Sequence, residues 1–192
     1  MHGEMADLIV KTAHDLIVEC GYSAFSYADI AERVALRKPS IHHHFPTKVS
    51  LVVEVLRQYR GQLAQTTERL DHEFPNPLNR LKWVAQRWET CIQNQSESFC
   101  VATLLAAELP VLPQEVGVEV RHYFDHLSKW LESTFAQGRK AKRIFFRDKP
   151  RVEAQNFIAL VHGAMISARV YGNCAVYQDV MRSTLNRLST PK

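Results

Sequence analysis

The sequence predicts an all-α protein, and three features of the chain indicate this class. Apolar residues recur at the three- and four-residue spacing of amphipathic helices through most of the 192 residues. No segment alternates polar and apolar residues for long enough to indicate a β-strand. Helix-start and helix-break residues punctuate the pattern, most clearly at Phe74-Pro75-Asn76-Pro77. We therefore expect a series of helices joined by short turns.

A short helix is predicted to begin at Tyr27. Ser26 is followed three positions later by Asp29, which is the spacing of a capping box: the hydroxyl accepts a backbone N–H, and the carboxylate bonds back to the helix start. The apolar positions then fall at i, i+3, i+4 and i+7, at Tyr27, Ile30, Ala31 and Val34. The helix therefore has one narrow buried stripe.

A second short helix is predicted after a tight turn. Pro39 fits the first turn of a helix, where its missing N–H would have no partner. Ile41 and Phe45 then face inward at i and i+4. Polar side chains occupy the other faces, namely Lys38, Ser40, His42, His43 and His44. Two short helices with basic and imidazole side chains on the second have the layout of a DNA-binding helix-turn-helix.

A third helix is expected directly after this pair. Pro46 ends the preceding run, and Thr47 can cap the new helix. Lys48 and the first N–H groups then lie at the positive end of the helix dipole, where a phosphate binds readily.

The order IAxxxxxxxxSIHHHFPTK, from Ile30 to Lys48, resembles the N-terminal domain of the TetR/AcrR family of transcriptional repressors. A helix ending at Cys20-Gly21 precedes it and a long helix follows, as in that family. The resemblance implies a helix-turn-helix DNA-binding domain over residues 1–48 and a helical effector-binding and dimerisation domain over residues 49–192. It also implies a ligand-responsive regulator, most often a repressor, that binds double-stranded operator DNA and a small-molecule effector without a cofactor.

The chain departs from the family pattern at four positions. The family usually has Gly where Ala35 and Pro39 stand, Tyr at His42 and Glu at Val49. Ala35 replaces a residue suited to a left-handed turn, and His42 changes the chemistry of a contact residue. The operator sequence therefore cannot be copied from a relative.

Charge is concentrated around the predicted motif. The net charge is only +4, but residues 33–60 contain the basic residues Arg33, Arg37, Lys38, Lys48, Arg57 and Arg60 against the single acid Glu54. The first helix is acidic, so we expect it to lie behind the motif, away from phosphates. The candidate DNA-contacting residues are Ser26, Tyr27, Arg37, Lys38, Pro39, Ser40, His42, His43, His44 and Lys48.

The alternatives from other classes are a helical metal-binding or enzymatic protein that uses His42–His44, and a purely structural module. Consecutive helical residues point about 100° apart, so the three imidazoles cannot converge on one ion. The chain contains no HExxH motif, nucleophile elbow or glycine-rich phosphate loop, so we expect no enzyme and no metal site. A purely structural role would not explain the basic and imidazole side chains on the second helix.

Composition favours a cytoplasmic protein. No apolar run is long enough to span a membrane, and Glu4 and Asp7 interrupt the start of the chain, where a secretory signal would be apolar. The four cysteines have no CxxC spacing. We expect them to be reduced, packed thiols.

The remaining chain reads as further helices. They are expected over about 49–72, from Asn76 or Pro77 to about Ile92, over 99–109 with most sides buried, from Gln114 to a basic turn at Gly138, over 151–171, and over 177–188. The helix over 151–171 has small residues every fourth position, so a neighbouring helix can approach closely. Spacing alone leaves open whether that neighbour is in the same chain, and the family resemblance favours a homodimer. The candidate interface residues are Ala159, Gly163, Ser167, Tyr171, Met181 and Leu185.

An effector pocket is implied by the resemblance, and aromatic residues with a few polar groups could line it. The candidates are Trp83, Trp88, Phe99, Cys100, Thr103, Leu104, Tyr123, Phe124, Phe157, Val161, His162 and Met165. For any one of them, ordinary core packing is the competing interpretation.

Overall fold

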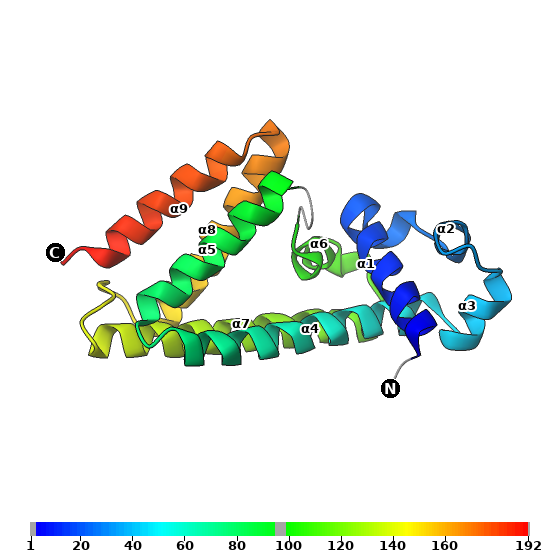
Figure 1. The fold of residues 1–192 in the computed structure, drawn as a ribbon, viewed down its shortest axis with the longest axis horizontal. Helices are drawn as coiled ribbons and strands as arrows, with labels where there is room; N and C mark the ends of the chain where they lie inside the picture. Colours follow the sequence, from blue (N-terminus) through cyan, green and yellow to red (C-terminus); the bar gives the residue numbers. More distant parts are fainter. Residues whose placement is uncertain (1–2, 95–98, 192) are drawn as a thin grey trace. The chain divides into compact units, whose positions relative to one another are not determined.

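The computed structural model describes residues 3–94 and 99–191, and every regular element in these ranges is a helix (Figure 1). In chain order the elements are α1 (Glu4–Ala24), α2 (Tyr27–Arg33), α3 (Lys38–His44), α4 (Lys48–Glu73), α5 (Pro77–Asn94), α6 (Val101–Ala107), the 3₁₀-helix η1 (Leu109–Val111), α7 (Gln114–Lys140), α8 (Pro150–Tyr171) and α9 (Cys174–Ser189). The predicted all-α class is confirmed. Among the described residues, none of these helices has the length and apolar character needed to cross a membrane.

The chain forms two compact units, and the division falls within α4 and α7. Unit 1 comprises Met1–Gln62 and Cys100–Phe124, and unit 2 comprises Leu63–Phe99 and Asp125–Lys192. In unit 1, α1 packs against α2 and α6, and α2 packs against α3. In unit 2, α5, α8 and α9 pack against one another. The largest fully buried side chains include Ile9, Ile17, Ile30, Ile41, Leu51 and Leu56 in unit 1, and Leu70, Leu81, Phe135, Phe157 and Tyr177 in unit 2.

The helix starts follow the local signals in the sequence. The capping box at Ser26 is formed, with Ala28 N donating to Ser26 Oγ at 3.1 Å and Ser26 N donating to Asp29 Oδ2 at 2.6 Å. Thr47 Oγ1 accepts the N–H of Ser50 at 3.0 Å, so Thr47 caps α4. These caps satisfy N–H groups that have no partner within the helix.

Helix α1 is broken at Gly21, where the carboxylate of the residue that follows α6 approaches the backbone. Gly21 has φ 83° and ψ 174°, a conformation that L side chains rarely adopt. The side chain of Glu108, which follows α6, accepts the N–H of Tyr22 at 2.9 Å. Its Oε1 also lies 2.7 Å from the position that a Cβ on Gly21 would occupy. Gly21 is therefore required both for its dihedral angles and for this close approach.

Two expected helix ends were wrong. The helix expected over 99–109 ends at Ala107 and is followed by η1, because Pro110 has no N–H with which to continue the α-helical hydrogen bonds to the carbonyl of Ala106. Within α6 the buried residues are Val101, Ala102 and Leu105, and Phe99 and Cys100 are buried just before it, so fewer sides are covered than expected. Helix α7 continues through Gly138 to Lys140. Tertiary packing explains that glycine, because Ile144 fills the space that a Cβ would take.

The cysteines also differ from the expectation in part. Cys91 and Cys100 are buried, but Cys20 is exposed and Cys174 is half-buried. All four thiols are free. Cys20 lies on α1, where its Sγ donates to Leu16 O at 3.1 Å. The expectation of packed thiols therefore holds for Cys91 and Cys100 but not for Cys20, and only in part for Cys174.

Candidate DNA-binding site

A buried tyrosine fixes the angle between α2 and α3. Tyr27 is 8% exposed, and its hydroxyl donates a hydrogen bond to the carbonyl of Phe45 at 2.8 Å. Burial raises the pKa of Tyr27 to about 12, so the phenol remains a donor at neutral pH. Its ring also lies 4.7 Å from the ring of His42. The side chain of the first residue of α2 therefore contacts both the body of α3, at His42, and its end, at Phe45.

The turn between α2 and α3 contains a non-glycine residue in a left-handed conformation. Ala35 has φ 53°, and the N–H of Leu36 closes the turn on the carbonyl of Ala31 at 3.0 Å. The backbone thus keeps the geometry for which the family usually has glycine, although alanine is disfavoured there.

Replacing Ala35 by glycine should stabilise the domain. The left-handed conformation costs an alanine roughly 1–2 kcal/mol, and the larger unfolded-state entropy of glycine offsets about 0.4–1 kcal/mol of the gain. We expect Ala35→Gly to raise the free energy of unfolding by about 0.5–1 kcal/mol in urea titrations. Ala31→Gly, the same change in helical backbone, should lower it by about 1 kcal/mol. Equal destabilisation by both would contradict the strain at Ala35.

The exposed face of α3 carries most of the side chains that the sequence offers as candidate DNA contacts. Arg37, at the N-cap, and Lys38, Pro39, Ser40, His42, His43 and His44 are all exposed. His42 Nδ1 lies 3.3 Å from the carbonyl of Pro46, so this ring is held locally. The rings of His43 and His44 meet edge to face at 5.7 Å. In the part of the chain that the structure describes, no group of three His, Cys, Asp or Glu side chains could hold a metal ion.

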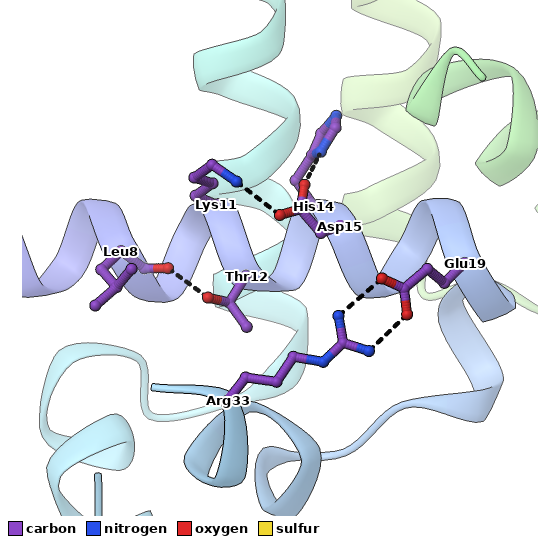
Figure 2. Close-up of polar contacts among 7 residues, drawn as sticks. All are labelled: Leu8, Lys11, Thr12, His14, Asp15, Glu19 and Arg33. Carbon is purple, nitrogen blue, oxygen red and sulfur yellow. Dashed lines mark hydrogen bonds and ion pairs between the residues drawn. The ribbon is translucent and has the colours of Figure 1, made fainter. Parts of the chain in front are cut away.

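Several basic side chains near the motif form ion pairs with acidic residues that are distant in sequence. Figure 2 shows the guanidinium of Arg33 on α2 bonded through two nitrogens to both carboxylate oxygens of Glu19 on α1, at 2.8 and 2.5 Å. Glu119 of α7, which is only 6% exposed, accepts bonds from Arg57 at 3.1 Å and from Arg60 at 3.4 Å. The local positive charge is therefore smaller than the sequence count, and Arg37, Lys38 and Lys48 remain.

Lys48 lies in an aromatic cage at the start of α4. Its ammonium donates to the carbonyl of Phe25 and lies 4.0 Å from the centroid of the Phe25 ring and 4.6 Å from that of Tyr22. Desolvation by burial lowers the pKa of Lys48, and nearby anionic groups act in the opposite direction. Lys48 thus ties α4 to the segment before α2. The sequence pattern did not indicate Tyr22 or Phe25, since neither has a spacing that marks a contact with Lys48.

The candidate effector residues are distributed over both units. In unit 1, Cys100 and Tyr123 are buried and meet, with 3.7 Å between Sγ and the phenol oxygen. Thr103, Leu104 and Phe124 are half-buried there. In unit 2, Trp88, Phe99, Phe157, Val161 and Met165 are buried, while Trp83 and His162 are half-buried. Unit 2 also contains a groove of about 600 Å³ lined by Ala64, Thr67, Glu68, Asp71, His72, His126, Lys129 and Trp130, none of which is a candidate.

The candidate interface residues of α8 lie mostly on its exposed face. Ala159 and Gly163 are exposed, Tyr171 is 72% exposed, and Ser167 is half-buried with its hydroxyl on the carbonyl of Gly163 at 3.0 Å. On α9, Met181 is buried inside unit 2 and Leu185 is half-buried. Sequence analysis missed Ile166 and Val170, which are 50% and 73% exposed. Their signal was the i+3 and i+7 spacing from Gly163.

Two short helices, the first begun by a capping box, joined by the Tyr27 hydrogen bond and with basic side chains exposed on the second, define a helix-turn-helix protein of the DNA-binding class. The family description "Bacterial regulatory proteins, tetR family" matches residues 9–55, and "Tetracyclin repressor-like, C-terminal domain" matches residues 77–184. The chain belongs to the TetR family of transcriptional regulators, which are DNA-binding proteins and not enzymes.

Three known proteins illustrate the similarity. A TetR-family regulator from Agrobacterium tumefaciens has 41% sequence identity, with a TM-score of 0.94 over 96% of this chain and 97% of its own. The HTH-type transcriptional repressor NemR of Escherichia coli (strain K12) is 22% identical over 95% of this chain and 93% of NemR. AibR, crystallised in complex with isovaleryl coenzyme A and operator DNA, is 18% identical with a TM-score of 0.72, over 98% of this chain and 100% of that chain.

Proposed function

We propose that this regulator is a repressor that binds a palindromic operator as a homodimer and is released by a small, largely apolar effector. The exposed polar face of α3 is the observation that carries the proposal, because Lys38, Ser40 and His43 all point to solvent and not into the core. The repressor name of NemR and the operator complex of AibR support the same mode of action. As part of this proposal, we expect the protein in the cytoplasm, where its DNA target would lie.

The homodimer follows from how a helix-turn-helix finds its site. One reading helix contacts too few bases to specify a genomic site, whereas two copies about 34–36 Å apart read successive major grooves. The exposed apolar side chains of α8, Ile166, Val170 and Tyr171, offer the second copy a surface. Ala159 and Gly163 let the helices cross closely.

Effector release requires a link between α6 and the reading head. Thr103 and Leu104 are candidate effector residues on α6, and Glu108 directly follows this helix. The carboxylate of Glu108 holds the N–H of Tyr22 at the break in α1. We propose that an effector displaces α6 and through Glu108 shifts α1, so that the two heads no longer match the groove spacing. The effector must bind the released state more tightly than the DNA-bound state, since equal affinity would shift nothing.

A mobility-shift titration with DNA from the neighbourhood of the gene tests the proposal. The measurement is made at two salt concentrations with random DNA as competitor, because phosphate contacts alone give salt-dependent binding without preference. A repressor should prefer one segment over random DNA by about 10³-fold or more. Binding that never exceeds that of random DNA would overturn the operator proposal.

Lys38 and His43 should carry sequence preference. Replacing either by alanine should relax discrimination at one base position in each half-site by about 1–3 kcal/mol, measured by competition with operators altered at single positions. His72→Ala, which removes an exposed imidazole at the end of α4, serves as the control and should change nothing. An equal loss of affinity for random DNA would assign the residue to a phosphate contact instead.

A further inference from the structure

The segment from Arg139 to Arg151, which closes α7 and opens α8, is the most basic surface of unit 2. We call it the basic loop. It contains Arg139, Lys140, Lys142, Arg143, Arg147, Lys149 and Arg151, and its single acid is Asp148. All seven basic residues are exposed. Within residues 3–94 and 99–191, no ion pair joins any of the seven to a carboxylate, and the nearby Glu153 is paired with Arg187 at 3.4 Å.

The backbone of the basic loop is fixed by packing and hydrogen bonds. The carbonyl of Gly138 accepts the N–H groups of Arg143 at 2.9 Å and Ile144 at 3.1 Å, and Ile144 is buried against Gly138. The N–H of Phe145 bonds to the carbonyl of Leu188 at 2.8 Å. The charges are therefore presented from an ordered scaffold.

Helix electrostatics explain only part of this charge. Arg139 and Lys140 lie in the last turn of α7, where the helix dipole favours cations. Lys149 is the N-cap of α8 and Arg151 lies in its first turn, where cations are unfavourable. These two residues, together with Lys142 and Arg143 in the turn, add like charges that stabilise nothing in the described fold. A polyanion that contacts this loop would account for them.

The shape of the basic loop selects among polyanions. A peripheral membrane site would combine basic residues with exposed apolar side chains that enter the lipid. Here Ile144 is buried and Phe145 is half-buried. Phe146 packs against Phe135, with ring centroids 5.4 Å apart, under the guanidinium of Arg139 at 4.0 Å. The apolar side chains thus serve as scaffold, and charge alone faces outward. An extended row of phosphates matches that surface.

We propose that the basic loop is a second DNA-contacting surface, separate in sequence from the helix-turn-helix, which binds the phosphates of duplex DNA without reading bases. Such contacts release counterions and make affinity depend on salt with a slope of about 0.9 per phosphate neutralised. The loop would add affinity for any duplex and leave operator preference to α3. The proposal rests on the DNA-binding class of the protein and not on the palindromic operator.

The test compares two triple variants of the full chain with equal charge change. One combines Arg143→Gln, Arg147→Gln and Lys149→Gln. The control combines Lys82→Gln, Lys129→Gln and Arg182→Gln, which are exposed elsewhere in unit 2. Affinity for a random-sequence duplex is measured between about 50 and 200 mM salt. The slope of log affinity against log salt should be smaller in the loop variant by up to about 2.7. Over this range the wild-type protein should therefore lose about 40-fold more affinity than the loop variant. The control should retain the wild-type slope, and operator preference should persist in both.

Equal slopes for the loop variant and the wild-type protein would overturn the proposal. An equal loss in the control would do so too, because it would show a general effect of net charge. Vesicles containing phosphatidylglycerol form a further arm: loss of vesicle binding with an unchanged DNA slope would assign the loop to lipid and reject DNA. If the wild-type protein showed no operator preference, the proposed α3 readout would fail. The salt slopes of the two variants would still decide the basic-loop proposal separately. The helical signal in circular dichroism and the melting temperature check that each variant is folded. The single variant Arg147→Glu should also lower the affinity for duplex DNA.

Discussion

Gly163→Arg is expected to yield a folded monomer of 22.0 kDa that has lost operator binding. Nothing lies within 4 Å of the position that a Cβ on Gly163 would occupy, and the position is exposed, so the arginine side chain can extend into solvent in the monomer. In a dimer crossed at Ala159 and Gly163, however, it would place a bulky charge between two closely packed helices. Operator affinity should fall by at least about 10³-fold, since only one half-site per protein is then read.

Sedimentation at micromolar concentration and operator titration check this result. Gln86→Arg adds the same side chain at an exposed position of α5 and should remain a dimer with normal binding. Circular dichroism should show equal helicity for both variants. The α8 interface would be abandoned if Gly163→Arg sedimented as a dimer or if the wild-type protein were a monomer.

The second large effect is expected at Lys48. We predict that its ammonium contacts a DNA phosphate while it remains bonded to the carbonyl of Phe25, because an ammonium has three N–H donors. Lys48→Met keeps the aliphatic chain and removes the charge. It should lower affinity for all sequences alike, by roughly tenfold near 100 mM salt, and reduce the salt slope by about 0.9.

Tyr22→Leu separates the phosphate contact from the cage. This variant keeps the Lys48 charge and removes one of the two rings beside it, so the slope should stay at the wild-type value. Its free energy of unfolding should fall by about 0.5–2 kcal/mol through the lost cation–π contact. A wild-type salt slope in Lys48→Met would show that Lys48 only holds α4 to the segment before α2.

The sequence predicted those parts of the fold that depend on neighbouring residues. The start of α2 at Tyr27 followed from Ser26 and Asp29, because a capping box is completed within four residues. The left-handed conformation of Ala35 was unexpected for alanine, and the hydrogen bond from the N–H of Leu36 to the carbonyl of Ala31 closes the turn around it.

The pairing of charges could not be predicted in the same way. Arg33, Arg57 and Arg60 counted as free positive charge in the sequence, but Glu19 and Glu119 neutralise them across distances of 14 to 62 residues. Such pairs depend on which helices pack together, and no periodicity encodes that. The contacts of Lys48 with Tyr22 and Phe25 could not be predicted for the same reason, because they too depend on how the helices pack.

The contact between Glu108 and the break in α1 restricts how the DNA-binding part of this protein can be joined to the body of another regulator. A reading head cut after the start of α4 and joined to the body of another regulator would leave the N–H of Tyr22 without its carboxylate. The break at Gly21 would then lack the contact from outside the head that holds it in this structure. Chimeric sensors built from this head should therefore carry an acid at the position that follows α6, and heads from other regulators should be chosen with glycine at the corresponding break.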